Sequence, residues 1–479
     1  MCSPNCFASE NNLSGKEKRT VIILSIIFVV VFSGFDGMQN LQSTLNNESG
    51  RGVISLSVVY GCFVLSSFFA PSFIRVLTAK GCLIICCVSH VVYAASNLYP
   101  VFWTLLSASA FVGLTSGALW TSQGMYISQC AISFSQTKNV PVKEIFGKFH
   151  GIFYFSYAFP RILGNSLSSI ILMQSHYNET TTNSSETGEI ITCGADLCPE
   201  MSMAQVSLEE PDPLTVKILM AAFTTLSIIG LFLCIFLLPP LPITVTSSQK
   251  SVCRKMLSSS CSCLRLNTDV AMILFIPSVV LFSFVESFSW IDIPKAYISC
   301  PFGVEFVGFS MALKGVMNGI SSFLLPRLAN LIGRKYVMTS LIIGITASYV
   351  GFLVWTPTDD GLPQIMGIIA VQGLFEGGFY TLLAALLSFM YAKKTEAAFA
   401  SLTTWKALGN TVNIGLAYYL CERSRLYIMF ALCTLSIISY VALEIHLQKK
   451  TKLTEVDYEE ENETINVELR GAEDSSDTK

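Results

Sequence analysis

Arg161-Ile-Leu-Gly-Asn-Ser166 has a close counterpart, Lys406-Ala-Leu-Gly-Asn-Thr411, in the other half of this 479-residue chain. Three more pairs of short segments match in the same order, and they are 32–36 with 282–286, 66–71 with 321–326, and 113–117 with 373–377. Any single short match is expected by chance. Four matches in the same order indicate an internal duplication.

Each matched segment lies in an apolar run that is long enough to cross a bilayer. A spanning helix needs about 20 residues for about 30 Å of hydrocarbon, and it satisfies its own backbone polar groups in lipid. We identify twelve runs, at 20–39, 53–74, 81–98, 101–127, 145–173, 214–238, 270–290, 302–325, 336–355, 362–392, 397–420 and 426–446. The matches relate each run to the sixth run after it. The predicted fold class is an all-α membrane protein with twelve transmembrane helices in two parallel six-helix repeats, which is the major facilitator architecture.

The composition excludes an ordinary water-soluble protein. Hydrophobic residues make up 52% of the chain and charged residues 13%, whereas a soluble domain averages about 25% charged residues. The net charge of −3 gives no reason to expect a nucleic-acid partner. The sequence has no Gly-rich phosphate loop, nucleophile elbow or complete zinc motif, so we expect neither an enzyme nor a bound cofactor or metal.

The basic residues predict which side of the membrane each connection occupies. If the N-terminus is cytosolic, 22 of the 30 Lys and Arg residues fall in the inner connections and tails. The remaining eight are Arg51, Lys295, Arg423 and Arg425 in outer connections, and Arg161, Lys217, Lys314 and Lys406 within helices. We therefore expect both termini to lie in the cytosol.

The longest predicted outer connection, 174–212, contains no Lys or Arg and carries sequons at Asn178 and Asn183. A third sequon, at Asn47, lies in the first outer connection. We expect N-linked glycans at all three positions. Cys193 and Cys198 lie in the same long connection, and we expect them to form a disulfide with each other on the oxidising side, with free thiols as the alternative.

The predicted domains are a cytosolic N-terminus (1–19), a six-helix bundle (20–238), a cytosolic linker (239–269), a second six-helix bundle (270–446) and a cytosolic tail (447–479). The linker holds Cys253, Cys261 and Cys263 beside basic residues, which suits palmitoylation and unmodified thiols equally. The tail is acidic and has few apolar residues, so we expect it to be disordered.

Six ionisable residues lie well inside the predicted helices, and they are Asp36, Arg161, Glu286, Lys314, Glu376 and Lys406. Each costs roughly 2.5–3.5 kcal/mol at the centre of a membrane helix, so they cannot all face lipid. Gln39 and Asn40 share a helical face with Asp36 and join the six as candidate cavity residues. Two interpretations stay open. The charges form ion pairs that hold the helices in register, or they line a path for a proton, an ion or a polar solute.

Three stretches resemble the uncoordinated-93 (unc-93) family, and its homolog A branch most closely. They are Leu56-Ser-Val-Val-Tyr-Gly61 with the following 66–69, Gly113-Leu-Thr-Ser-Gly-Ala-Leu-Trp120, and Trp290-Ile-Asp-Ile-Pro-Lys-Ala-Tyr297. The resemblance covers most of the chain between the first and last predicted helices. It implies a major-facilitator-like membrane protein that acts on partner membrane proteins, by regulating potassium-channel complexes or by escorting innate immune receptors. The escort role belongs to another branch, and no substrate residues come with the resemblance.

One motif departs from typical major facilitators, which carry Gly-x-x-x-Asp-Arg/Lys-x-Gly-Arg/Lys-Arg/Lys between helices 2 and 3. The corresponding segment here, 71–81, lacks the Asp, and only Gly333-Arg-Lys335 remains between the predicted helices 8 and 9. That Asp helps to hold the inner gate shut in transporters of this fold. Its absence puts a standard alternating-access cycle in doubt.

The leading functional hypothesis is a multi-pass plasma-membrane protein that regulates a partner membrane protein such as a potassium-channel complex. An endolysosomal membrane is the alternative location. The alternative function is a secondary transporter that moves a small solute or ion by alternating access, with the six buried charges in its cavity. A scaffold with a sealed interior is a third interpretation, since fold alone does not determine function.

Overall fold

The computed structural model describes residues 5–45, 51–177, 193–198, 213–241, 264–303, 305–358 and 360–476, and every regular element within these ranges is helical. The first group of long helices comprises α1 (Asn5–Leu45), α2 (Arg51–Ser96), α3 (Phe102–Lys138), α4 (Val142–Tyr177) and α6 (Pro213–Leu237). The second group comprises α8 (Val270–Asp292), α10 (Glu305–Ile332), α11 (Arg334–Val354), α12 (Leu362–Met390), α13 (Thr395–Tyr419) and α14 (Glu422–Ser476). Three short elements lie at connections, and they are η2 (Gly194–Asp196), η3 (Ile293–Ser299) and α9 (Cys300–Phe302).

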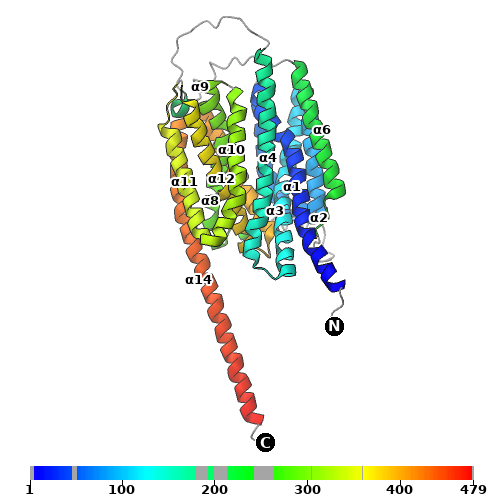
Figure 1. The fold of residues 1–479 in the computed structure, drawn as a ribbon, viewed down its shortest axis with the longest axis vertical. Coiled ribbons are helices and arrows are strands. Elements are labelled where there is room, and N and C mark those ends of the chain that lie inside the picture. The colour runs from blue at the N-terminus through cyan, green and yellow to red at the C-terminus, as the bar shows by residue number, and fades with distance from the viewer. Residues whose placement is uncertain are drawn as a thin grey trace.

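The long helices stand side by side, and the two groups occupy the two sides of the bundle in Figure 1. Helices α4 and α10 are neighbours where the groups meet. Both chain termini emerge at the same end of the bundle, which we call the termini end, and α9 lies at the opposite end, which we call the α9 end (Figure 1).

Eight helical segments among the described residues are long and apolar enough to cross a membrane, judged by length and composition. They are Gly15–Gln39, Ile54–Ser96, Phe102–Lys138, Val216–Leu237, Val270–Phe302, Arg334–Val354, Leu362–Met390 and Glu422–Lys449. The chain is therefore a multi-pass membrane protein. Helices α4, α10 and α13 fall outside this set, and each carries one of the basic residues predicted to lie well inside a helix, Arg161, Lys314 or Lys406.

Helix α2 covers two of the predicted runs, 53–74 and 81–98, and its helical conformation is interrupted between them. Thr78 has a φ of 66°, in the left-handed region that is uncommon for a β-branched residue. The break lies just before the second run, so the two parts of α2 correspond to two separate apolar runs of the sequence.

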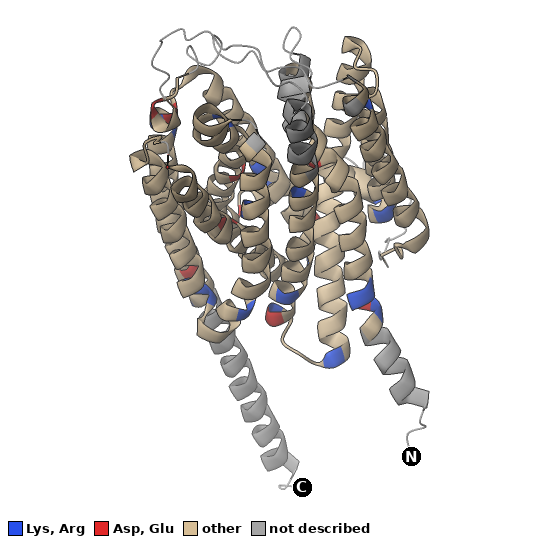
Figure 2. Ribbon diagram, turned by 45° about the horizontal axis from the view of Figure 1, so that its top comes forward, with Lys and Arg blue, Asp and Glu red and all other residues tan. Residues whose placement is uncertain are grey.

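Most of the charged side chains lie at the ends of the bundle rather than along it. In Figure 2 several Lys and Arg residues gather toward the termini end, whereas the helical walls are mainly uncharged. A few charged residues of both signs lie among the helices (Figure 2). These interior charges are the starting point for the candidate site.

Small residues let α3 approach α2 and let α12 approach α10. A Cβ atom on Gly117 of α3 would overlap the backbone at Ser66 and Ser67 of α2. The Ser66 hydroxyl uses this proximity, donating to the Gly113 carbonyl at 2.9 Å and accepting from the Gly117 N–H at 3.0 Å. On α12, a Cβ on Gly373 would lie 2.7 Å from the carbonyl oxygen of Lys314 on α10. Both glycine pairs therefore serve close helix packing.

The two groups of helices contact each other closely toward the termini end. The hydroxyl oxygens of Ser128, near the end of α3, and Ser388, near the end of α12, lie 2.9 Å apart. His150 Nε2 on α4 lies 2.9 Å from the same Ser388 oxygen. An ion pair of 3.1 Å joins Arg75 on α2 to Glu396 in the first turn of α13. These contacts close the bundle on this side of the interior.

The tail differs from the sequence-based expectation of disorder, because α14 continues as one helix to Ser476. In Figure 1 it extends well beyond the other helices at the termini end. Residues 447–476 contain no proline and one glycine. Nothing in this composition forces the helix to end, since proline and glycine are the strongest helix breakers.

Candidate functional site

A cavity lies between the two groups of helices. It has a volume of about 980 Å³, part of which is open to solvent. Five of the six predicted intramembrane charges line it, and they are Asp36, Arg161, Glu286, Lys314 and Lys406. The sixth, Glu376, lines an adjoining smaller cavity of about 380 Å³ together with Arg161, Glu286 and Lys406. The structure thus brings all six residues, which come from six different helices, to one region.

Glu286, on α8, is the centre of one set of ion pairs. Its Oε1 atom lies 2.9 Å from Lys406 Nζ on α13 and 3.7 Å from Arg161 Nη2 on α4. Its Oε2 atom accepts a hydrogen bond of 3.2 Å from Asn410 Nδ2. The Glu286 side chain is 5% exposed, so these partners replace the water that a carboxylate would otherwise bind.

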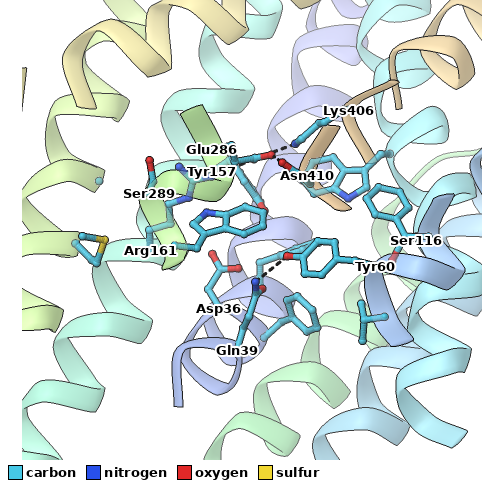
Figure 3. A pocket seen from close by; sticks show the side chains of 18 of the residues that line it. Asp36, Gln39, Tyr60, Ser116, Tyr157, Arg161, Glu286, Ser289, Lys406 and Asn410 are labelled. Atoms are coloured by element: carbon cyan, nitrogen blue, oxygen red, sulfur yellow. Dashed lines mark hydrogen bonds and ion pairs between the residues drawn. The ribbon is translucent and has the colours of Figure 1, made fainter. Parts of the chain in front are cut away.

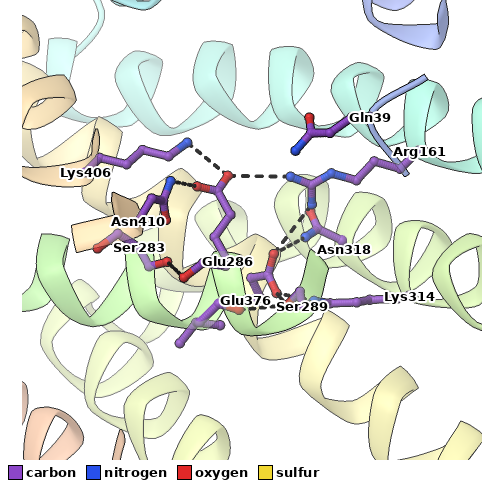
Figure 4. Close-up of polar contacts among 12 residues, drawn as sticks. Gln39, Arg161, Ser283, Glu286, Ser289, Lys314, Asn318, Glu376, Lys406 and Asn410 are labelled. Carbon is purple, nitrogen blue, oxygen red and sulfur yellow. Dashed lines mark hydrogen bonds and ion pairs between the residues drawn. The ribbon is translucent and has the colours of Figure 1, made fainter. Parts of the chain in front are cut away.

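Glu376, on α12, is the centre of the second set and is also bonded to Arg161. Its Oε2 atom lies 2.6 Å from Lys314 Nζ on α10 and accepts a hydrogen bond of 3.1 Å from the Ser289 hydroxyl. Its Oε1 atom lies 3.5 Å from Arg161 Nη1. Figure 4 shows Arg161 between the two glutamates, with Lys406 beyond Glu286 and Lys314 beyond Glu376. The two sets therefore form one network.

Asp36, on α1, stands apart from this network. Figure 3 shows it directed into the space beside Arg161, Gln39 and Tyr60. Among the described residues its carboxylate makes no ion pair, and its Oδ2 atom is buried without a hydrogen-bond partner. The neighbouring Gln39 donates from Nε2 to the Tyr60 hydroxyl oxygen at 2.7 Å. The side chain of Asn40 lies outside the described residues.

The ion pairs bear on the first interpretation of the buried charges, and the second, a path for a proton, an ion or a polar solute, stays a prediction. Five residues pair with one another across helices, and the same residues form walls of cavities. The pairs explain how so many charges are accommodated in a membrane protein, because each ion has a partner of opposite sign.

Aromatic side chains form much of the cavity wall, and the sequence pattern alone did not single them out. Lys406 Nζ lies 4.9 Å from the ring centroid of Tyr380 and 5.2 Å from that of Trp120, which are cation–π distances. Tyr60 of α2 and Trp290 of α8 bring their ring centroids to 5.8 Å across the two groups. One feature of the sequence could have identified three of these aromatic residues. Tyr60, Trp120 and Trp290 all lie in the stretches that resemble the unc-93 family.

A second buried charge cluster lies near the α9 end, where the sequence predicted an outer connection. The Arg425 guanidinium on α14 bonds Asp292 of α8, with Nη2 and Oδ2 2.6 Å apart, and also Glu422, with Nη1 and Oε1 3.1 Å apart. The side chains of Arg425 and Asp292 are 2% and 1% exposed. The positions of these residues at the ends of apolar runs gave no sign that they are buried.

Cys193 and Cys198 are both in disulfides, but the prediction that they pair with each other is wrong. Cys193 bonds Cys300 in α9, and Cys198 bonds Cys421, which directly precedes α14. The segment 193–198 is bound further by a hydrogen bond from the Glu422 N–H to the Leu197 carbonyl at 3.0 Å. The short spacing between Cys193 and Cys198 in the sequence favoured a disulfide between them. In the folded chain, Cys300 and Cys421 come from two other connections that lie beside this segment.

Several predicted modification sites lie outside the described residues. These are the sequons at Asn47, Asn178 and Asn183 and the linker cysteines Cys253, Cys261 and Cys263. Within the described ranges, no group of three or more His, Cys, Asp and Glu side chains is arranged to hold a metal ion.

Two family models match the chain. The model described as "Ion channel regulatory protein UNC-93" matches residues 43–301, which is more than half of the chain, and the model described as "Major Facilitator Superfamily" matches residues 271–469. Among solved structures, the Escherichia coli fucose:proton symporter FucP superposes with a TM-score of 0.61 at 11% identity, over 88% of this chain and 98% of that chain. The human organic anion transporter MFSD10 superposes with a TM-score of 0.57 at 12% identity, over 88% and 99%. At these identities the likeness shows the fold alone.

Curated relatives cover almost the whole chain. "Protein unc-93 homolog A" of Bos taurus is 28% identical over 434 residues, covering 90% of this chain and 94% of the relative. Its Xenopus laevis counterpart is 26% identical over 463 residues, covering 94% and 98%. The "Putative potassium channel regulatory protein unc-93" of Caenorhabditis elegans is 24% identical over 450 residues, covering 91% of this chain and 63% of that protein. The chain therefore belongs to the unc-93 family and has a major facilitator fold.

Proposed function

We propose that this chain is a carrier that binds a small polar or charged solute in its central cavity and moves it across the membrane by alternating access. The observation that carries the proposal is that Arg161 joins the two groups of helices. This residue of the first helix group bonds Glu286 and Glu376 of the second group at the cavity wall. A site made from both groups is opened and closed when the groups move relative to each other.

The proposal includes twelve spans in two parallel repeats. The helices α1, α3, α4 and α6 with the two parts of α2 make six spans, and α8, α10, α11, α12, α13 and α14 make six more. Equivalent packing supports the repeat, because Gly113 and Gly117 approach α2 in the first group as Gly373 and Gly377 approach α10 in the second. These twelve helical segments support the proposed count of spans.

The proposed orientation has both termini in the cytosol and the α9 end outside. Both disulfides join segments near α9, and disulfides persist on the oxidising side of a membrane. The concentration of basic residues toward the termini end agrees with an inner location (Figure 2). We propose the plasma membrane as the site of residence, with an endolysosomal membrane as the alternative.

Uptake by vesicles tests the carrier. The full-length protein is reconstituted and offered a labelled panel of carboxylates, amino acids, sugars, nucleosides and amines. Glu286→Gln should reduce uptake of the transported solute at least about tenfold, because Arg161 and Lys406 lose a shared counter-ion. Trp290→Ala, which alters the cavity wall without changing a charge, should also reduce uptake.

Asp196→Asn is the matched control for the uptake assay. Asp196 is an exposed carboxylate near the α9 end, far from the cavity lining, and its loss should leave uptake unchanged. Size-exclusion chromatography of each variant separates loss of transport from loss of folding. If no solute class moves above protein-free vesicles, or if both cavity variants transport as well as the unchanged protein, the carrier proposal fails.

A second candidate function is regulation of a partner membrane protein, with a potassium channel as the partner. The name of the Caenorhabditis elegans relative favours it. Co-expression should then change the current of the partner channel, and the two proteins should purify together. Unchanged currents across several potassium-channel types would remove this candidate. Uptake without any effect on currents would leave the carrier as the function.

A further inference from the structure

The first group of helices contributes two of the six interior charges, and the second group contributes four. The first group contributes one acid and one base, Asp36 on α1 and Arg161 on α4. The second group contributes Glu286, Glu376, Lys314 and Lys406, two acids and two bases. Each group is therefore electrically balanced by itself when every one of these residues is ionised.

In this conformation the ion pairs are not confined to one helix group. Each glutamate already has a lysine of its own group at short distance, with Lys406 2.9 Å from Glu286 and Lys314 2.6 Å from Glu376. Arg161 joins both pairs at longer distances of 3.7 and 3.5 Å. The second group thus holds one positive charge more than it needs, and Asp36 is left in its own group without a counter-ion.

Asp36 and Arg161 lie on helices that are in close contact. A Cβ atom on Gly164 of α4 would lie 2.9 Å from the Ser33 carbonyl oxygen and 3.0 Å from the Gly37 nitrogen of α1. Gly164 is one helical turn after Arg161, and Gly37 is next to Asp36, so the two charged residues lie at the same level of one packed helix pair. Asp36 is the carboxylate of the first group that Arg161 can reach when the two groups separate.

We propose that the carboxyl group of Asp36 binds and releases a proton. It is neutral while Arg161 is paired with Glu286 and Glu376, and it is ionised when Arg161 pairs with Asp36 instead. The inference deepens the proposed carrier function and rests on it. In the step, the O–H bond of Asp36 breaks, its proton passes to water in the cavity, and the resulting carboxylate forms an ion pair with Arg161. The two glutamates keep their lysines. Proton release is thereby linked to separation of the two groups.

The surroundings of Asp36 suit a proton better than a metal cation. Phe32 and Phe35 line the cavity on the same helix, and aromatic walls provide few oxygen ligands for a metal. The titratable and charged groups facing this part of the cavity are Tyr60 and His90 on α2, Tyr157 and Arg161 on α4, Glu286 on α8, Lys314 on α10 and Lys406 on α13. Asp36 is partly buried, and its Oδ2 atom is buried without a hydrogen-bond partner. Burying this group costs much more free energy when it is ionised than when it is protonated.

Infrared difference spectroscopy tests the proposal without any solute. The full-length protein in lipid nanodiscs is titrated with acid and base, and the carbonyl stretch of a protonated carboxyl group is recorded. At each pH the spectrum of Asp36→Asn is subtracted from that of the unchanged protein, because the other carboxyl groups of the chain also become protonated in acid and are common to both. This difference spectrum should contain the band at neutral pH and lose it at alkaline pH. With Arg161→Gln in both proteins of the comparison, the band should persist at alkaline pH, because the ionised Asp36 then has no partner in its own helix group.

The spectroscopic test has a control variant and defined outcomes that would contradict the proposal. Asp196→Asn, which alters an exposed carboxylate, should leave the band unchanged. If Asp36→Asn does not fold, Asp36→Glu retains a carboxyl group and should shift the band in frequency. The absence of a band from the difference between the unchanged protein and Asp36→Asn, or a difference band that Na⁺ removes at constant pH, would overturn the proposal. Because no solute is added, these outcomes are independent of the uptake assay.

Discussion

At the scale of single residues, a buried ion is stable only where partners surround it. Arg425 illustrates this, because Asp292 and Glu422 both bond its guanidinium and all three side chains are at least nine-tenths buried. Arg423, two residues earlier, pairs with Asp196 at 2.8 Å, but these side chains are 48% and 57% exposed. The two arginines have similar partners in very different environments.

Substituting these two arginines should therefore have very different effects on stability. Arg425→Met leaves two carboxylates buried without their counter-ion and should reduce stability by about 3–5 kcal/mol. Arg423→Met removes an exposed pair and should leave the denaturation midpoint of the purified protein unchanged within error. Thermal unfolding in detergent measures both. Equal shifts for the two variants would contradict the assignment of Arg425 to a buried network, and Arg425→Lys should recover part of the loss.

At the scale of helices, close approach depends on which glycine faces a neighbour. α12 offers a matched pair of positions. A Cβ on Gly377 would overlap the Asn318 carbonyl of α10 and lie 2.6 Å from the Ser321 hydroxyl oxygen, whereas a Cβ on Gly367 would meet no atom within 4 Å. The same substitution thus probes helix packing at one position and helix propensity alone at the other.

Gly377→Ala should destabilise the protein by about 1–3 kcal/mol, because α12 and α10 must move apart. Gly367→Ala should be neutral or stabilising by up to about 1 kcal/mol, since alanine favours a helix more than glycine does. Unfolding midpoints of the two variants, compared with the unchanged protein, measure the difference. A neutral Gly377→Ala would mean that the two helices are not packed as closely as described.

At the scale of the whole molecule, contacts at the termini end hold the two groups of helices together. The Arg75–Glu396 ion pair is one of them. Arg75 lies in 71–81, the segment that lacks the Asp typical of major facilitators. Arg75 in this segment and Glu396 on α13 therefore join the two groups of helices by an ion pair.

Glu396→Arg should favour opening at the termini end, because it places two like charges at the former ion pair. The pair is partly exposed, with side chains 45% and 22% accessible, so we expect an effect of about 1 kcal/mol or less, roughly two- to fivefold in the opening equilibrium. The reporter is a cysteine introduced by Ser388→Cys and labelled with a maleimide. The double variant Arg75→Glu with Glu396→Arg should restore slow labelling. Equal labelling rates in all three proteins would exclude this role.

Part of the candidate site was predictable and part was not. The intramembrane positions of Asp36, Arg161 and Glu286 follow from charged residues inside apolar runs, and the cavity contains all three. The burial of Arg425 was not predictable, because a residue next to an apolar run is buried or exposed according to what packs beside it. The partners of Cys193 and Cys198 were not predictable either, since disulfides join residues that are adjacent in space and distant in sequence.

The amino-acid sequence by itself determined that the chain is helical, that it belongs in a membrane and which ionisable residues lie inside it. These properties depend on local composition, because each apolar run must satisfy its own backbone in lipid. Only the tertiary structure decided that Arg161 bonds two glutamates of the other helix group, while Asp36 makes no ion pair among the described residues and its Oδ2 atom has no hydrogen-bond partner. Pairing depends on the rotation and separation of packed helices, and differences of a few ångströms there decide which carboxylate a guanidinium reaches.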